Sequence, residues 1–328
     1  KYLAEGVGIL SSLVISRFLF PEDIGLIAMI VLFYAFLMKF SDLGVSELVI
    51  RESISSKTIG QIRKLFLVKG AVLGLVMVLI TYPISLFFNE ERIVLPGFCY
   101  GVFLLLYALP KTDVAVLRKN ERFVTLAKTE LIVASVQAIL TIILAIYGLA
   151  YWSLVLPHFI LPLIYWKLLG DKARPYYPKE AHVQPLSFKA LMTSIGIIEF
   201  VRYWEERLDN LLAGKIYGEG TLGVYNRAYM LISLPVTLIH PLLENILLPA
   251  ISRNKLDAQN IWTEVERIHG LLFGLFFIPF VLFTYYPTTL SVFLWGESWS
   301  GVGKYLALLA PALYWQLFIA STPSLYLY

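Results

Sequence analysis

Long apolar runs recur along almost the whole of this 328-residue chain. Runs of about 18 or more apolar residues are typical of helices that cross a lipid bilayer. The composition agrees, because 58% of the residues are hydrophobic, only 15% are charged, and the mean hydropathy is +0.73. The sequence therefore predicts an all-α integral membrane protein. Its single cysteine, Cys99, excludes an internal disulfide and any multi-cysteine metal site.

Charged clusters and Gly or Pro residues divide the apolar sequence into ten candidate spans. These spans cover residues 3–20, 24–43, 65–88, 93–109, 123–147, 152–169, 190–214, 224–251, 268–293 and 305–320. No run alternates between apolar and polar residues over about ten positions, which is the pattern of a barrel strand.

The basic residues predict how the spans are oriented. Most of the 27 Lys and Arg residues fall in four connections, within residues 51–69, 111–128, 167–189 and 253–267. The connections of the opposite side hold only Arg17, Arg92, Lys215 and Lys304. Because cytoplasmic connections carry an excess of Lys and Arg, we expect the first set, and the N-terminus, to be cytoplasmic.

This orientation requires a highly charged segment to cross the membrane. The basic connections 167–189 and 253–267 are predicted on the same side, so an even number of spans separates them. Residues 224–251 are long enough for only one span. Residues 190–214, which include the stretch EFVRYWEERLD, must therefore form the other.

The charges of this seventh span fall on one side of a helix. At 100° per residue, its polar side chains occupy a face about 140° wide, with Arg207 near the edge. The residues on this face are Glu199, Arg202, Glu205, Glu206, Asp209 and Asn210. Charges within a bilayer normally face a bundle interior or a water-filled cavity. We therefore expect a hydrated cavity, with packing pairs that orient helices as the alternative interpretation.

Two pairs of similar motifs indicate an internal repeat. RFLFPEDIGLIAM, from Arg17, resembles KIYGEGTLGVYNR, from Lys215, and TYPISLFF, from Thr81, resembles TYYPTTLSVF, from Thr284. Both pairs fall on outer turns of equal orientation, as expected for parallel repeats. The predicted domains are an N-terminal six-helix lobe, 1–170, a cytoplasmic linker, 171–187, and an incomplete C-terminal lobe of four helices, 188–328. We expect the chain to be a piece of a longer protein, with about two further helices after Tyr328.

The absence of several motifs limits the function. No G-x-x-x-x-G-K-[ST] phosphate loop is present, which excludes a self-contained ATP-driven pump. The outer connections NEER, GLAY and WGESWSG are too short to form the external domain of a membrane glycosyltransferase. No histidine pair or cysteine cluster suggests a metal site.

The motifs RFLFPEDIGLIAM, FSDLGVSELVIRE and RLDNLLAGKIYGEGTLGVYNRAYMLISLPVTLI resemble those of Wzx-type polysaccharide flippases. These proteins belong to the multidrug/oligosaccharidyl-lipid/polysaccharide exporter superfamily. The resemblance implies a MATE-like bundle of two lobes, with twelve or more helices around a central cavity. It also implies alternating access that moves an undecaprenyl-diphosphate-linked oligosaccharide across the bacterial cytoplasmic (inner) membrane, for surface polysaccharide biosynthesis. No enzymatic activity and no cofactor are implied, beyond H⁺ or Na⁺ as a coupling ion.

Physical chemistry assigns expected roles within this resemblance. Basic and amide groups can bind the diphosphate or acidic sugars, and the residues expected to do so are Arg17, Lys39, Arg202, Arg207, Asn210, Asn226 and Arg227. Carboxylates can bind the coupling ion, and these candidates are Asp42, Glu199, Glu206, Asp209 and Glu244. The outer turns where the halves hinge are expected at Pro21, Gly25 and Gly223, with ordinary turn chemistry as the alternative.

Two other functions stay open at this stage. A cation-coupled multidrug antiporter of the same fold would use the acidic residues of the seventh span directly. A membrane glycosyltransferase is the alternative from a different class. The expected partners are the lipid-linked oligosaccharide and membrane lipids, with a polysaccharide polymerase and a chain-length regulator as further candidates, and no nucleic acid.

Overall fold

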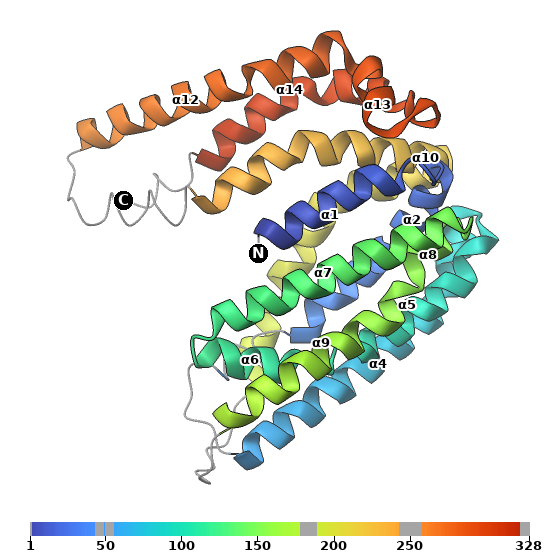
Figure 1. Ribbon diagram of the computed structural model, residues 1–328, viewed down its shortest axis with the longest axis vertical. Helices are drawn as coiled ribbons and strands as arrows, with labels where there is room; N and C mark the ends of the chain where they lie inside the picture. The colour runs from blue at the N-terminus through green and yellow to red at the C-terminus, as the bar shows by residue number, and fades with distance from the viewer. Residues whose placement is uncertain (1, 43–48, 50–55, 178–188, 243–257, 322–328) are drawn as a thin grey trace. The chain divides into compact units, whose positions relative to one another are not determined.

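The computed structural model describes residues 2–42, 49, 56–177, 189–242 and 258–321. Within these residues every regular element is a helix (Figure 1). In the described part of the chain, four helices are long and apolar enough to cross a membrane, or up to six if each of two bent helix pairs forms one span. The prediction of an all-α membrane protein is confirmed, whereas the ten spans and the two-lobed arrangement stay predictions.

The chain divides into two compact units, Lys1–Leu222 and Gly223–Tyr328. The first contains α1 (Tyr2–Ile15), α2 (Pro21–Asp42), α4 (Ser56–Phe88), η1 (Glu91–Ile93), α5 (Val94–Leu106), α6 (Lys111–Lys119), α7 (Phe123–Ile146), α8 (Trp152–Val155), α9 (Pro157–Ala173) and η2 (Arg174–Tyr176). Helix α10 (Lys189–Leu242) begins in the first unit and ends in the second. The second continues with α12 (Ala258–Tyr285), α13 (Pro287–Trp295), η4 (Glu297–Trp299) and α14 (Val302–Ser321). The lobe boundaries predicted from the sequence stay a prediction.

In the first unit, α4 packs closely against α5 through small residues. A Cβ atom added to Gly74 would lie 2.5 Å from the Gly101 carbonyl oxygen, and one added to Gly101 would lie 2.9 Å from that of Gly74. Small residues at helix crossings allow backbones to approach in this way in membrane proteins. The core beside this crossing contains Met29 and Phe103, both fully buried.

The outer face of α4 is apolar and exposed. Its exposed side chains recur at helical spacing and are Val68, Val72, Leu75, Leu79, Tyr82 and Leu86. Exposed apolar surface of this extent is unusual for a protein surrounded by water, but is expected for a helix in contact with lipid tails. The packing of the first unit therefore supports the membrane assignment independently of the hydropathy.

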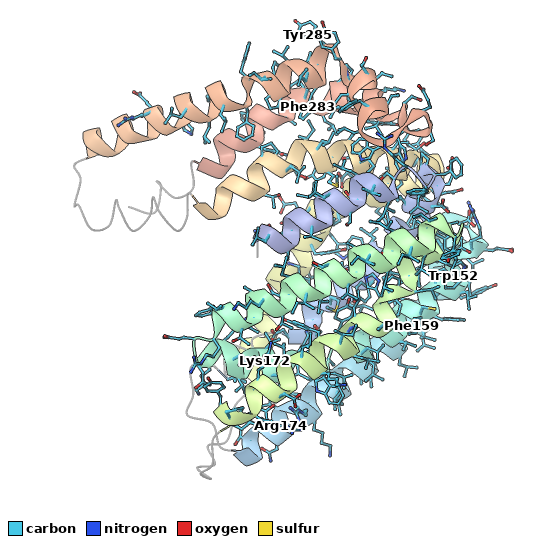
Figure 2. All side chains as sticks on the ribbon, viewed as in Figure 1. Trp152, Phe159, Lys172, Arg174, Phe283 and Tyr285 are labelled. Atoms are coloured by element: carbon cyan, nitrogen blue, oxygen red, sulfur yellow. The ribbon has the colours of Figure 1, made fainter. Side chains whose placement is uncertain are left out.

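The structure brings together the connections that the sequence assigns to one side. Arg63 on α4 donates to Asp113 on α6 at 3.0 Å, and to the hydroxyl of Tyr177, which follows η2, at 2.6 Å. Lys111 on α6 donates to the Ser41 hydroxyl at the end of α2. These residues come from the ends of α2 and α4, from α6 and from the segment after α9. Figure 2 shows Lys172 and Arg174 at this end of the first unit and Trp152, on α8, at the opposite end.

The other set of connections also meets. Asp23 accepts a hydrogen bond from the backbone N–H of Tyr151 at 3.1 Å, so the first turn of α2 contacts the turn before α8. Arg92 binds both carboxylate oxygens of Glu90, at 2.8 and 2.9 Å, and also binds Glu219 on α10 at 2.9 Å. The first unit therefore has two separate polar ends. The connections that meet at each end are those that the basic residues assign to the same side of the membrane.

Candidate functional site

Helix α10 presents an aromatic face and a charged face in the first unit. The Tyr203 hydroxyl donates to the backbone carbonyl of Leu32 on α2. The rings of Trp204 and Phe33 meet edge to face with centroids 5.9 Å apart. The aromatic face thus fixes this part of α10 against α2.

The charged side chains that the sequence places on one face of this segment are exposed in the structure. Arg202 forms an ion pair with Glu206 at 3.2 Å, and these side chains are 68% and 52% exposed. Glu205, Arg207 and Asp209 are exposed as well. The charges therefore do not serve to pack α10 against α2. The side chain of Glu199 lies outside the part that the structure describes.

Asn210 departs from this pattern because it is buried, with 7% exposure. Its backbone N–H and its Nδ2 both donate to Asp209 Oδ1, at 2.7 and 3.0 Å. Asn210 therefore borders the packed face and holds the Asp209 carboxylate in position. The sequence alone does not reveal this contact.

Lys39 and Asp42 lie near the C-terminal end of α2, at the polar end that contains Lys111. Lys69 donates to the backbone carbonyl of Asp42 at 3.4 Å. Arg17, which is exposed, lies in the turn before α2. The 22 residues of α2 separate the two positions by roughly 30 Å along the helix axis. Arg17 and Lys39 therefore do not form one site.

The predicted hinge glycine Gly25 is at a very close backbone contact. A Cβ atom at position 25 would lie 1.7 Å from the carbonyl oxygen of Glu219, so only glycine fits there in this conformation. The neighbouring Gly218 has φ +79° and interrupts the helical backbone of α10. Pro21 is the first residue of α2, and Gly223 is a buried residue inside α10. The sequence places a connection between the predicted spans 190–214 and 224–251, and the break at Gly218 lies within it, at the GEG tripeptide.

In the second unit, the Arg227 side chain is buried, with 8% exposure. Its guanidinium carbon lies 5.4 Å from the centre of the Trp299 ring, and Nη1 contacts Met230 Sδ at 3.7 Å. Its Nε has no hydrogen-bond partner among the described residues. Asn226 beside it is half-buried, and Glu244 lies outside the described residues. A buried guanidinium of this kind can bind an anion.

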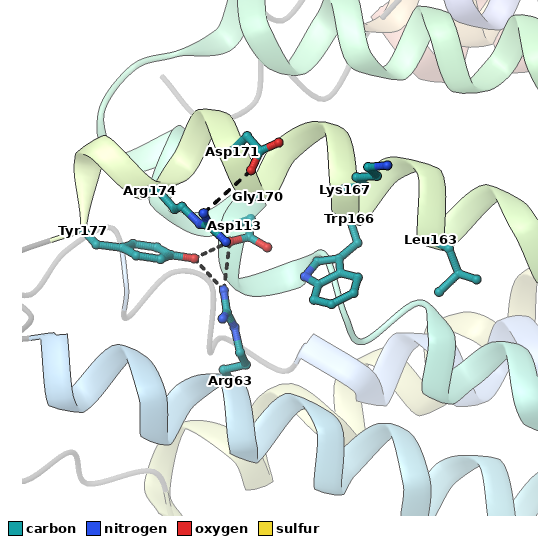
Figure 3. A pocket seen from close by; sticks show the side chains of 9 residues that line it. All are labelled: Arg63, Asp113, Leu163, Trp166, Lys167, Gly170, Asp171, Arg174 and Tyr177. Atoms are coloured by element: carbon teal, nitrogen blue, oxygen red, sulfur yellow. Dashed lines mark hydrogen bonds and ion pairs between the residues drawn. The ribbon is translucent and has the colours of Figure 1, made fainter.

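The sequence did not predict a cluster of Arg63, Asp113 and Tyr177 at the polar end that contains Lys111. Asp113 is fully buried, and its Oδ1 accepts hydrogen bonds from Arg63 and from the Tyr177 hydroxyl (Figure 3). Burial raises the pKa of the Asp113 carboxyl, while the hydrogen bond from Tyr177 and the charge of Arg63 act in the opposite direction. The only sequence signal is an acid in a very basic connection. The cluster ties α4, α6 and the segment after α9 together.

Comparison with known proteins places these features in context. The profile of a protein family described as "Polysaccharide biosynthesis protein" matches residues 14–303. The teichuronic acid biosynthesis protein TuaB of Bacillus subtilis is 22% identical over 219 residues, which are 65% of this chain and 44% of that protein. The amylovoran biosynthesis protein AmsL of Erwinia amylovora is 27% identical over 222 residues, 65% of this chain and 56% of that protein. The chain thus spans about half the length of these curated relatives. No solved structure matches the chain.

Proposed function

The chain belongs to the family of polysaccharide biosynthesis proteins, and from that premise we propose that it is a flippase for lipid-linked oligosaccharides. Its substrate is an undecaprenyl-diphosphate-linked repeat unit, which it moves from the cytoplasmic to the outer leaflet by alternating access. It acts in the bacterial cytoplasmic membrane, within a MATE-like bundle of two lobes, as a transporter without enzymatic activity.

The observation that carries this proposal is the charged face of α10. Arg202, Glu206 and Asp209 are exposed on a helix whose aromatic face packs against α2. Exposure of such charges to lipid tails would cost about 2.5–3.5 kcal/mol per residue on insertion scales. A crossing helix with this face therefore requires a water-filled space, which is what a polar glycan needs to pass through the bilayer.

The proposal divides the work between the two kinds of charge. Arg202 and Arg207 bind the diphosphate, since guanidinium groups form bidentate contacts with phosphate oxygens. Glu206 and Asp209 bind the coupling cation, H⁺ or Na⁺. The hydrogen bonds from Asn210 hold the Asp209 carboxylate in one position, which supports its role as a cation ligand.

The proposed orientation can be tested by labelling in a Cys99→Ala background. Asn120→Cys lies in the turn between α6 and α7, and Glu91→Cys lies in the turn after α4; both positions are exposed. With a cytoplasmic N-terminus, a membrane-impermeant maleimide should label position 91 in intact spheroplasts and position 120 only after permeabilisation. Labelling of both positions in intact spheroplasts would show that the two polar ends are not on opposite sides.

Deletion of the gene tests the function in the cell. A strain without the flippase should accumulate complete lipid-linked repeat units and lose surface polysaccharide, because synthesis continues while translocation stops. Mass spectrometry of extracted lipids measures the repeat unit. A repeat unit lacking one sugar would instead identify a glycosyltransferase, and normal polysaccharide with increased drug sensitivity would identify a multidrug antiporter.

A further inference from the structure

A pocket of about 380 Å³ opens beside Asp113, at the polar end formed by α4, α6 and the end of α9 (Figure 3). Pockets for small ligands are typically about 300–1,000 Å³ in volume. The pocket uses none of the residues assigned above to substrate transport. All its lining residues belong to the first unit.

One atom of the pocket lacks a partner in spite of full burial. Asp113 is 0% exposed, and its Oδ1 already accepts from Arg63 and Tyr177. Its Oδ2 is buried and has no hydrogen-bond partner among the described residues. A buried carboxylate oxygen without a partner is costly, so a ligand that donates a hydrogen bond to it would be favoured. Hydroxyl groups are the simplest donors of this kind.

The remaining lining residues change from basic to apolar along α9. Lys167 and Arg174 are exposed cations that line the pocket together with Arg63. The ion pair between Arg174 and Asp171 is long, at 4.0 Å. The lining carries three basic and two acidic side chains, a net charge of +1. Leu163 and Trp166, earlier on α9, are exposed and apolar. This gradient matches a molecule with an anionic head and an apolar tail, and tryptophan is common at the membrane–water interface.

We propose that this pocket binds the phosphate headgroup of a lipid that also carries free hydroxyl groups. Arg174 and Lys167 contact the phosphate, a headgroup hydroxyl donates to Asp113 Oδ2, and the tail passes over Trp166 and Leu163. Two sources supply this chemistry: a bilayer lipid of the phosphatidylglycerol type, or a polyprenyl-diphosphate-linked glycan. Only the second source rests on the proposed function.

Native mass spectrometry of the purified full-length protein tests the proposal. The probes are phosphatidylglycerol and phosphatidylethanol with the same acyl chains, because both are phosphodiesters with one negative charge and only the first has headgroup hydroxyls. Phosphatidylglycerol should bind about tenfold more tightly, the effect expected of a hydrogen bond to a buried charged group. Asp113→Asn should reduce this preference, since the amide nitrogen cannot accept a hydrogen bond. Equal binding of the two lipids to the wild-type protein would overturn the proposal.

Two alanine variants near the end of α9 test the pocket without changing Asp113. One removes a basic side chain that lines the pocket, and the other removes a neighbouring basic side chain that does not. Arg174→Ala should weaken phosphatidylglycerol binding about tenfold, the effect of one charge-assisted hydrogen bond. Lys172→Ala removes the same charge two residues away, but Lys172 points to Thr129, at 3.5 Å, and does not line the pocket. Its binding should equal that of the wild type, and equal losses in the two variants would contradict a specific site.

Competition distinguishes the two sources. If a polyprenyl-diphosphate-linked disaccharide displaces phosphatidylglycerol in the wild type but not in Arg174→Ala, the pocket receives the transported lipid. If phosphatidylglycerol binding depends on Arg174 and the disaccharide lipid does not displace it, the pocket binds a bilayer lipid. That second result supports the pocket and leaves the flippase to be judged by its own transport assay. Displacement that is unchanged in Arg174→Ala would place binding elsewhere.

Discussion

Arg202→Ala should give a folded, membrane-inserted protein whose transport rate is reduced at least about tenfold, the effect of one lost charged hydrogen bond in the transport cavity. The Arg202–Glu206 pair is exposed on both sides, and exposed pairs contribute only about 0–1 kcal/mol to stability. Folding should therefore persist, while the loss of a guanidinium that binds phosphate removes substrate contact. Arg202→Lys should keep part of the activity, because it keeps the charge without the bidentate geometry.

Two further variants separate substrate binding from ion pairing. Arg118→Ala removes an exposed arginine from α6, outside the charged face, and should transport at the wild-type rate. The exchange Arg202→Glu with Glu206→Arg restores the pair but moves the guanidinium by one turn, and it should not restore transport. Full recovery by the exchange, measured at equal protein level in membranes, would show that the pair serves only helix packing.

Gly25→Ala should destabilise the protein by about 1–3 kcal/mol, the usual cost of overpacking. The added methyl group would lie 1.7 Å from the Glu219 carbonyl oxygen, so α2 and the break in α10 must separate. Backbone cannot move aside as a flexible side chain can. Thermal unfolding of the purified protein in detergent measures the effect as a lower midpoint temperature.

Gly60→Ala is the matched control for this change. Gly60 also lies within a helix, α4, but nothing stands within 4 Å of a Cβ atom placed there. Alanine is favoured over glycine in a helix by about 0.8–1.0 kcal/mol, so this variant should be as stable as the wild type or slightly more stable. If both variants unfold at the same temperature, the contact between Gly25 and Glu219 does not hold α10 in place.

The helices of the first unit were largely predictable from the sequence. The lengths of the apolar runs and the basic residues between them predict spans at 123–147 and 24–43. These correspond to α7 (Phe123–Ile146) and α2 (Pro21–Asp42). Short polar helices carry no such signal, so α6 (Lys111–Lys119) was not predicted. The membership of the polysaccharide biosynthesis family, indicated by the motifs, is confirmed by the match to residues 14–303.

The candidate site was predictable only where one helix holds it. Residues at helical spacing, such as Arg202 and Glu206, are identified as neighbours by periodicity alone. The bond between Arg63 and Tyr177 joins residues 114 positions apart, and no local pattern reveals it. The burial of Arg227 likewise involves Trp299, which is distant in the sequence. Tertiary packing therefore decides which polar side chains are available to a substrate.

Translocation of a polyprenyl-diphosphate-linked oligosaccharide in vesicles, reconstituted with the full-length protein, is the most direct test of the proposed flippase. An impermeant glycosidase added outside reports the share of glycan in the outer leaflet. We expect the wild-type protein to make the whole pool accessible over time, at a rate that an H⁺ or Na⁺ gradient changes. The Arg202→Ala variant should leave only the initial outer-leaflet share accessible. Vesicles with folded wild-type protein in which the accessible share stays at its initial value, with and without either gradient, would contradict the proposal.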